Sequence, residues 1–293
     1  MSLGSRTRSL LPAALGSIPA FKGKGRITLL LDRVLTDVRN PRSYQVTGCL
    51  NNGVRFNFDL RPWGQKFAYY YREWEGEHIN VLRRLYSGDV FLDVGSSLGL
   101  YVVSMGKAVR SFGGSIISVE PVPFNLERQK RNVSLNNLED LVTYVQCALG
   151  SERALVRLKA DPLEADNNAF IAHEGGIEVV VSRLDDLVAE TDWGRIGTIK
   201  MDVEGYEPMV IEGARETIRR DRPVILAEFC RERMDINGFS MERTWEFLVD
   251  DLNYRCFRLS LRDKKLHLLE SAGLLENLFF IPTDVVIAPD LFK

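Results

Sequence analysis

From residue 89 onward, short apolar segments alternate with stretches of helical periodicity, and this alternation limits the chain to an α/β fold. Five apolar segments predict buried strands, at 90–94, 115–120, 142–149, 195–203 and 223–229. Strands of this kind, separated by helices, are typical of a mostly parallel sheet covered on both faces. Three further strands are predicted at 254–261, at 266–269 and within 277–287, and no helix separates them, so we expect an antiparallel hairpin at one edge.

The first 85 residues follow a different pattern, which predicts two units: a β-rich segment with a connecting helix at 1–85 and a main domain at 86–293. Strands are expected at 27–38 and 44–50, and Asn51-Asn52-Gly53 is a hairpin turn before the alternating strand 54–60. Six aromatic residues between Trp63 and Trp74 either cover an acceptor pocket or pack between this segment and the main sheet.

Composition excludes several classes of protein. The 293 residues are 45% hydrophobic and 27% charged, with a net charge of -2, so neither nucleic acid nor an anionic membrane is an expected partner. The four cysteines form no CxxC pair, which favours free thiols and no metal site. No apolar run reaches the ~18 residues of a membrane span. We therefore expect a cytoplasmic globular protein.

A glycine-containing turn, Asp93–Gly99, follows the first predicted strand and precedes a helix. Glycines at Gly95 and Gly99 allow a ligand to approach the backbone, and the helix N-terminus favours polar or anionic groups. The turn differs from the GxGxxG of dinucleotide-binding sites, because Ser97 stands where a second glycine is required.

Glu120 ends the second predicted strand, 25 residues after Gly95. A carboxylate at this position can accept two hydrogen bonds from ribose hydroxyls. The spacing is longer than the ~20 residues typical of nicotinamide sites. The alternative is a strand-end charge in water.

Asp202 and Glu204 lie at the carboxyl end of the fourth predicted strand, where open α/β sheets bind ligands. In an extended chain, two residues two apart point to one side. Paired acids here suit proton abstraction, substrate positioning or a divalent cation. Alternatively, Glu204 stabilises the start of the following helix.

An acidic insertion at 160–181 interrupts the alternation of strands and helices. We expect it to be a loop, either solvated or acting as a lid over a substrate.

In this order, the motifs resemble those of the FkbM family of S-adenosylmethionine-dependent methyltransferases. The matching segments are Phe91–Tyr101, Val119–Pro123, Asn132, Leu135–Asn136, Ala148–Gly150, Val181–Leu187, Ile199–Glu207, Gly213–Ala214 and Pro223–Glu228. Glu77 also resembles a recurrent acid of the family. The chief departure is Ser96-Ser97, where the family usually has Ala-Asn.

The resemblance implies a class I methyltransferase (Rossmann-like) fold with a seven-stranded, mostly parallel sheet, an antiparallel edge hairpin and a small N-terminal β-rich segment. It also implies S-adenosylmethionine as cofactor. The residues implied to contact it are Asp93, Gly95, Ser97 and Gly99 at the methionine part, Glu120 at the ribose, Cys147 and Ala148 at the adenine, and Asp202 at the methyl group.

The resemblance further implies O-methylation of a hydroxyl on a small-molecule or sugar-like acceptor. The catalytic candidates are Asp202, Glu204 and Glu228, as a coupled carboxylate base or as holders of a cation that lowers the hydroxyl pKa. Two other functions stay open: a nicotinamide-dependent oxidoreductase, and a non-catalytic scaffold with a nucleoside pocket.

Overall fold

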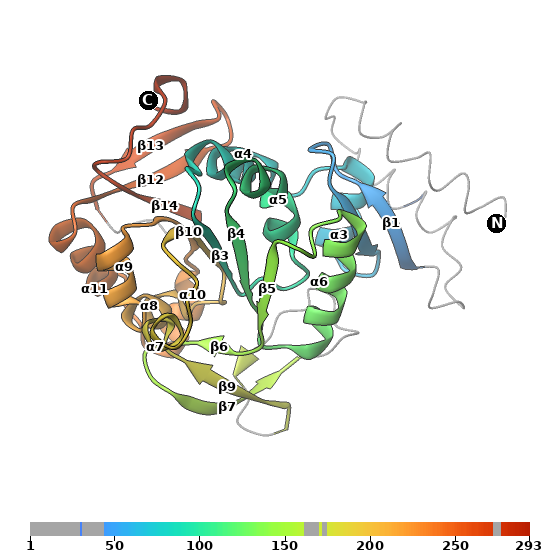
Figure 1. Ribbon diagram of the computed structural model, residues 1–293, viewed down its shortest axis with the longest axis horizontal. Helices are drawn as coiled ribbons and strands as arrows, with labels where there is room; N and C mark the ends of the chain where they lie inside the picture. The colour runs from blue at the N-terminus through green and yellow to red at the C-terminus, as the bar shows by residue number, and fades with distance from the viewer. Residues whose placement is uncertain (1–29, 31–43, 161–169, 172–174, 272–276) are drawn as a thin grey trace.

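The computed structural model describes residue 30 and residues 44–160, 170–171, 175–271 and 277–293. Apart from residue 30, the strand expected at 27–38 lies outside the described residues. Its central element is an eight-stranded sheet with the strand order β13-β12-β14-β11-β10-β3-β4-β5 (Figure 1). The strands are β3 (Val90–Val94), β4 (Ser115–Val119), β5 (Val142–Val145), β10 (Ile196–Met201), β11 (Val224–Glu228), β12 (Tyr254–Ser260), β13 (Lys265–Leu269) and β14 (Asn277–Pro282).

The expected α/β class and mostly parallel sheet are confirmed. Five neighbouring strands of the sheet pair in parallel: β5, β4, β3, β10 and β11. The remaining strands, β14, β12 and β13, pair antiparallel at the edge beyond β11. The sheet has eight strands rather than the expected seven, because β13 adds a further strand outside β12.

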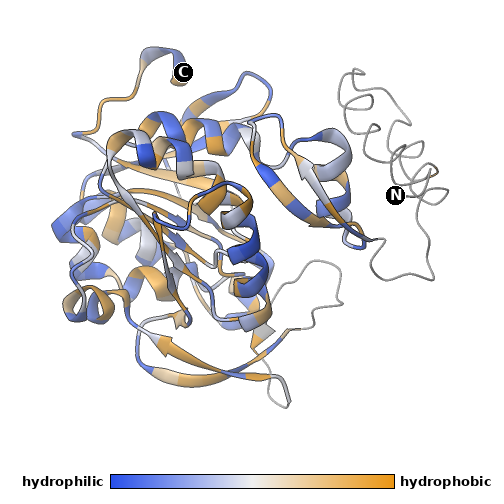
Figure 2. Cartoon of the chain, turned by 45° about the vertical axis from the view of Figure 1, so that its right-hand side comes forward, coloured by the Kyte–Doolittle hydropathy of each residue, from blue (hydrophilic) through white to orange (hydrophobic). Residues whose placement is uncertain are grey.

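Helices cover both faces of this sheet, and apolar side chains fill the two interfaces. One face carries α4 (Gly76–Leu85), α5 (Leu100–Phe112) and α6 (Pro123–Leu135). The other carries α7 (Leu184–Glu190), α8 (Glu207–Glu212), α9 (Arg215–Asp221), α10 (Arg231–Asn237), α11 (Glu242–Trp245) and the π-helical turn η2 (Glu246–Asp251). Figure 2 shows the hydrophobic strands enclosed between helices whose hydrophilic residues face outward.

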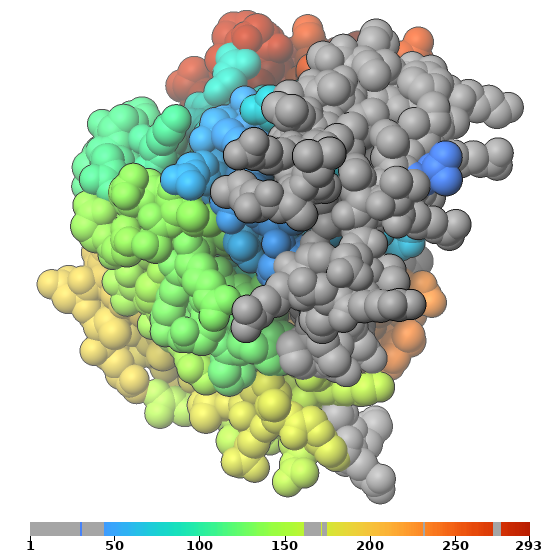
Figure 3. Space-filling model, turned by 90° about the vertical axis from the view of Figure 1, so that its right-hand side faces the viewer, coloured from blue at the N-terminus to red at the C-terminus, as the bar shows by residue number. Residues whose placement is uncertain are grey.

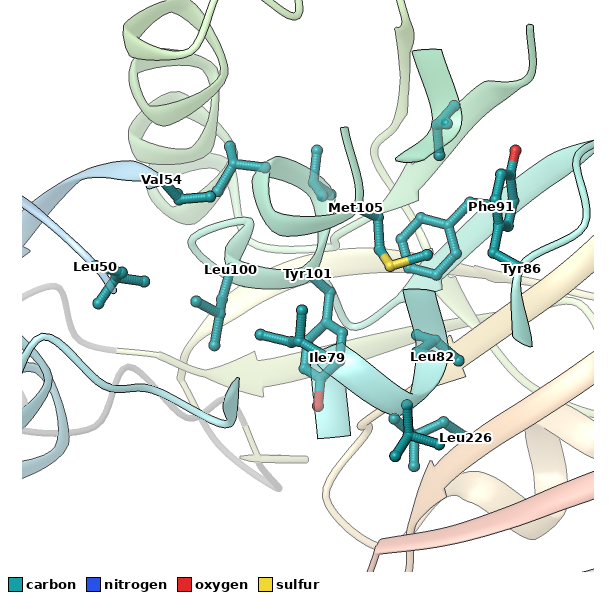
Figure 4. Packing of buried hydrophobic residues seen from close by; sticks show 14 of the residues in the cluster. Leu50, Val54, Ile79, Leu82, Tyr86, Phe91, Leu100, Tyr101, Met105 and Leu226 are labelled. Carbon is teal, nitrogen blue, oxygen red and sulfur yellow. The ribbon is translucent and has the colours of Figure 1, made fainter. Parts of the chain in front are cut away.

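The period of two in each strand assigns its residues to these faces. In β3, Phe91 joins the cluster under α4 and α5, whereas Leu92 joins the opposite cluster. Figure 4 shows Phe91 packed beside Met105 of α5 in the first cluster, with Leu82 of α4.

The N-terminal hairpin expected around Asn51-Asn52-Gly53 is confirmed. Its strands β1 (Gln45–Cys49) and β2 (Arg55–Asp59) pair antiparallel. The aromatic segment that follows forms the helix α3 (Trp63–Tyr71). Phe56 and Phe58 are fully buried in the same cluster as α4 and α5, and Figure 3 shows the hairpin side by side with α6.

Asn132 of α6 and Asn136, which caps the C-terminus of that helix, hold β2 against the main domain. Asn132 accepts a hydrogen bond from the Asn57 backbone N–H (2.8 Å) and donates to the Leu98 carbonyl (2.9 Å). Asn136 accepts from the Arg55 N–H (3.0 Å) and donates to its carbonyl (2.7 Å). Asn132 is fully buried, so its bonds satisfy the buried Leu98 carbonyl and the half-buried Asn57 N–H, whereas the bonds of Asn136 lie at the surface.

The segment after β5 differs from the sequence-based expectation. The predicted strand 142–149 is divided, because Ala148–Leu149 forms β6 in a second, four-stranded sheet with β7 (Ala154–Lys159), β8 (Phe170–Ile171) and β9 (Ile177–Ser182). The expected loop at 160–181 is therefore wrong for 170–171 and 177–181. The β-branched run of β9 pairs with β7 and contributes Val179 to a small core. Residues 161–169 and 172–174 lie outside the described residues.

Replacing Asn132 with alanine should lower the free energy of unfolding by about 2–4 kcal/mol, because it leaves two backbone groups without partners. Chemical denaturation measures the change. Arg131→Ala, at an exposed position of the same helix, is the control and should change stability by less than about 0.5 kcal/mol. Equal stability of the two variants would show that the hydrogen bonds of Asn132 do not stabilise the protein.

Candidate functional site

A cavity of 620 Å³ opens at the carboxyl ends of β3, β4 and β10. It lies between the turn after β3, the end of β4 and the segment after β10. Eight of the ten sequence-predicted site residues line it: Asp93, Gly95, Ser97, Glu120, Cys147, Ala148, Asp202 and Glu204. Gly99 and Glu228 are the two that do not.

The turn after β3 lies directly against the chain that leaves β10. Gly95 has a φ of +72°, and a Cβ atom at this residue would lie 2.0 Å from the Asp202 carbonyl oxygen. The Asp202 N–H donates to the Val94 carbonyl at 3.0 Å. Only glycine permits this approach, so the sequence-predicted glycine joins two walls of the cavity.

Gly99 has a different task from Gly95. It caps the N-terminus of α5 with a φ of +80°, and a Cβ atom there would lie 2.6 Å from Gln129 Cγ. Gly99 thus allows α5 and α6 to pack closely.

The serines that replace the family's Ala-Asn serve two structural purposes. Ser96 points into the core, where its hydroxyl lies 2.7 Å from that of Ser118, which contacts Gln129. Ser97 adopts a left-handed conformation with φ 48° and donates its backbone N–H to Glu120 at 2.8 Å. This bond ties the turn to the end of β4.

Glu120 is buried, and its carboxylate accepts hydrogen bonds from three donors. Its carboxylate accepts hydrogen bonds from the backbone N–H groups of Ser97 and Val122 (2.8 and 3.0 Å) and from the Asn125 side chain (3.2 Å). Burial raises the pKa of Glu120, and these hydrogen bonds oppose the rise. A carboxylate has about four acceptor positions, so Glu120 retains capacity for a ligand hydroxyl.

Three neighbouring strands place charged side chains on one face of the sheet. Asp93 of β3 is the register partner of Lys200 of β10. Glu228 ends β11 and lies two residues after Leu226, so it is on the same face of the sheet as that residue, the face covered by α4 and α5. Asp202 follows Met201, which pairs with Ala227. The carboxyl ends of β3, β10 and β11 therefore bring three acids and one lysine together.

Lys200 is the central residue of this group and is 1% exposed. Its Nζ lies 3.5 Å from Asp202 Oδ2 and 4.9 Å from the centre of the Tyr101 ring. Burial disfavours the ammonium, but the nearby carboxylates, Asp202 first, outweigh burial and raise the pKa of Lys200. Lys200 was not among the residues predicted for the site, although a lysine in an otherwise apolar strand indicates a special role.

Two of the carboxyl groups near Lys200, those of Asp93 and Glu228, have raised pKa values. Burial, reinforced by Asp202, raises the pKa of Glu228 to about 8. Burial raises the pKa of Asp93 to about 7, while Lys200 opposes the rise. Asp93 Oδ2 is buried and has no hydrogen-bond partner, although Asp93 lines the cavity.

Glu75 and Tyr101 complete the charged end of the cavity, and neither residue was predicted from the sequence to lie there. The Tyr101 hydroxyl donates to Glu75 Oε2, and both residues line the cavity. Figure 4 shows Tyr101 extending past Ile79 from within the hydrophobic cluster. Glu77, which resembled a family acid, instead pairs with Lys264.

Glu204 differs from its predicted orientation. The chain does not stay extended after Asp202, because Glu204 has a φ of 59° and its carboxylate pairs with Arg233 at 3.0 Å. The acid that begins the next helix is Glu207, which accepts the Val203 N–H at 2.8 Å. Asp202 and Glu204 therefore line the cavity as separate groups.

Cys147 precedes β6 and Ala148 begins it, and both residues line the cavity. Burial raises the pKa of the Cys147 thiol to about 11, so the thiol is neutral near pH 7. Leu149, Val156 and Leu158 extend this wall, which is suited to a flat apolar ligand group.

Within the part of the chain that the structure describes, no helix is long and apolar enough to span a membrane. No group of three or more His, Cys, Asp and Glu side chains has the arrangement of a metal site there.

Comparison with known proteins identifies relatives. A family model described as "Methyltransferase FkbM domain" matches residues 93–256, more than half of the chain. Methyltransferase sdnD of Sordaria araneosa is 26% identical, over 50% of this chain and 68% of that protein. Hexuronic acid methyltransferase AglP of Haloferax volcanii is 24% identical, over 50% of this chain and 58% of that protein. The chain thus matches little more than half of AglP.

Among solved structures, the FkbM methyltransferase of Methylobacillus flagellatus is similar to this chain. The two are 18% identical, with a TM-score of 0.47, and the match covers 92% of this chain and 58% of that one.

Gly95→Ala should destabilise the protein by at least ~2 kcal/mol more than Gly113→Ala. Gly113 has nearly the same φ, +71°, but a Cβ atom there meets nothing within 4 Å, so it reports the left-handed backbone cost alone. Thermal and chemical unfolding of both variants measure the difference. Equal destabilisation would show that the turn after β3 does not depend on close contact with Asp202.

Proposed function

Because this chain belongs to the FkbM methyltransferase family, we propose that it transfers a methyl group from S-adenosylmethionine to a hydroxyl oxygen of a small, sugar-like acceptor. One observation carries the proposal beyond the family. A single cavity extends from Glu120, which is at the position of an acid that binds ribose hydroxyls, to the buried acids around Lys200. It therefore combines a nucleoside site with groups able to move a proton.

The cavity residues fit the donor. Asp93 Oδ2 is a buried acceptor without a partner, and the donor's amino group is a suitable partner for it. Glu120 would hold the ribose hydroxyls with its remaining acceptor capacity. The apolar wall at Cys147 and Ala148 would hold the adenine, while Gly95 and Ser97 lie beside the methionine part.

When bound, S-adenosylmethionine supplies a methyl group already activated on a sulfonium. The protein's main contribution is then alignment of the acceptor oxygen, which can supply ~7–11 kcal/mol of the barrier. The acceptor hydroxyl must also lose its proton. We assign this task to the carboxyl pair of Asp202 and Glu228, with Asp202 toward the cavity and Glu228 behind it.

The acceptor class rests on two supports. One relative, AglP, is named for a hexuronic acid, which favours a sugar-like acceptor. The carboxylates near Asp202 repel a negatively charged acceptor, so we expect a neutral sugar-like molecule rather than an acid such as the one for which AglP is named. Trp74, Glu75 and Arg233 line the adjoining part of the cavity and offer stacking and hydrogen-bonding groups for a polyol.

Glu120→Ala should weaken binding of the demethylated product S-adenosylhomocysteine by roughly 10–100-fold, because hydrogen bonds to a charged acceptor are worth about 1.5–3 kcal/mol each. Isothermal titration calorimetry measures this. Glu127→Ala, at an exposed site on α6, is the matched control and should bind like the parent protein. An undiminished affinity in Glu120→Ala, or no binding to the parent protein, would overturn the proposal.

The carboxyl pair predicts a pH dependence. Glu228 is protonated below its pKa of about 8, so kcat/KM should rise about tenfold per pH unit below pH 8 and level off above it. In the Glu228→Gln variant, kcat/KM should not show this rise with pH. The assay is S-adenosylhomocysteine release, with an acceptor found by screening neutral sugars and polyols. An unchanged profile in Glu228→Gln would exclude the pair as the base.

A further inference from the structure

One wall of the cavity comes from α10 and the residues that follow it. Arg233, Ile236 and Asn237 of α10 line the cavity, and so does Phe239. Residues three and four apart lie on one face of a helix, so α10 presents a single face to the cavity. The donor contacts assigned to the ends of β3 and β4 and to the start of β6 leave this face for another ligand.

The turn after β10 holds α10 in place. Gly205 has a φ of +93°, and a Cβ atom there would lie 2.7 Å from Arg233 Cβ, so glycine is required for this close approach. The Arg233 guanidinium pairs with Glu204 of the same turn at 3.0 Å. Because Asp202 begins this turn, the cavity face of α10 has a fixed position relative to the acid assigned to the acceptor's proton.

The polar side chains of this wall bind one another. Asn237 donates a hydrogen bond to the Arg233 carbonyl at 2.8 Å and accepts one from the Tyr206 hydroxyl at 3.3 Å. These polar groups therefore have partners within the protein. The side chains that gain most from a ligand here are the apolar ones, because water is their alternative.

Three apolar side chains of this wall line the cavity: Met209, Ile236 and Phe239. Phe239 packs edge-on against Tyr206, with the ring centres 5.2 Å apart. Ile236 is 78% exposed, and Ile171 of the second sheet lines the same cavity with 42% exposure. Single exposed aliphatic residues are ordinary on a protein surface, but two on the walls of one ligand cavity indicate an apolar ligand group.

We propose that the acceptor is amphipathic, a sugar-like ring joined to an alkyl or alicyclic group, and that α10 binds the apolar group, with Ile236 as the specificity-determining residue. This inference rests on the proposed function, because it takes the hydroxyl near Asp202 as the one that is methylated. One cavity extends from Asp202 to Ile236, so a single molecule can place its hydroxyl at the acid and its apolar group against α10.

Alkyl β-D-glucosides are suitable probes, because they join a polyol ring to chains of known length. Calorimetry uses the protein saturated with S-adenosylhomocysteine and each glucoside below its critical micelle concentration. The dissociation constant should be at least ~10-fold lower for octyl than for ethyl glucoside. A fully buried methylene is worth roughly fourfold in affinity, so this ratio requires burial of only about two of the six added methylenes.

Ile236→Asn should reduce the ratio of the two dissociation constants to less than about threefold. Its affinity for S-adenosylhomocysteine should stay that of the parent protein. Ile236 is largely exposed, so the change is compatible with folding. Leu155→Asn is the matched control and should keep the parent ratio. Leu155 is 61% exposed but faces away from the cavity, because its neighbours in β7, Ala154 and Val156, line it.

Three results would overturn the amphipathic acceptor and leave the methyltransferase function intact: equal binding of ethyl and octyl glucoside, no binding of either, or a ratio that Ile236→Asn does not lower more than Leu155→Asn does. Weaker binding of S-adenosylhomocysteine to Ile236→Asn would also overturn it, because this wall would then belong to the donor. A parent protein that does not bind S-adenosylhomocysteine would contradict the proposed function itself.

Discussion

The close contact between the turn after β3 and the end of β10 is the constraint on which the site depends. Gly95 allows the two chains to approach, and the Asp202 N–H bonds to the Val94 carbonyl. This contact sets Asp202 beside the turn, and the bond from the Ser97 N–H holds Glu120 on the other side. The residues that would contact the two ends of a nucleoside-containing ligand are therefore fixed by backbone geometry rather than by flexible side chains.

The same sheet explains why so many charged groups are buried together. Alternation along each strand directs Asp93 and Lys200 to the face covered by α4 and α5, and parallel register sets them opposite each other. The apolar residues on that face, such as Phe91 before Asp93 in β3 and Leu226 before Glu228 in β11, pack under the helices. The hydrophobic core thus ends where the charged group begins, so these charges meet the cavity instead of bulk water.

Much of this arrangement could be predicted from the sequence. Apolar strands alternating with helices determine a parallel sheet, and strand ends in such a sheet share one edge, which is why Asp93, Glu120 and Asp202 were found. Glu75 and Tyr101 could not be placed in this way. Both lie outside the strands, and Glu75 depends on a left-handed backbone conformation that no periodicity reveals.

Other features of the sequence were misleading for physical reasons. Glu204 was expected beside Asp202, but that expectation assumed an extended chain, and the turn before α8 directs it to Arg233. The insertion after β5 looked like a loop because its acidic part dominates the composition, whereas β9 follows its β-branched residues and pairs with β7. Local composition cannot identify a strand whose stability depends on a partner elsewhere in the chain.

A crystal structure of the protein with S-adenosylhomocysteine tests the central claim most directly. We expect the ribose hydroxyls on Glu120, the amino acid end beside Gly95 and Asp93, and the sulfur on the side of Asp202 and Lys200. A nucleoside bound elsewhere, or a cavity that stays empty at saturating ligand, would contradict this account of the site.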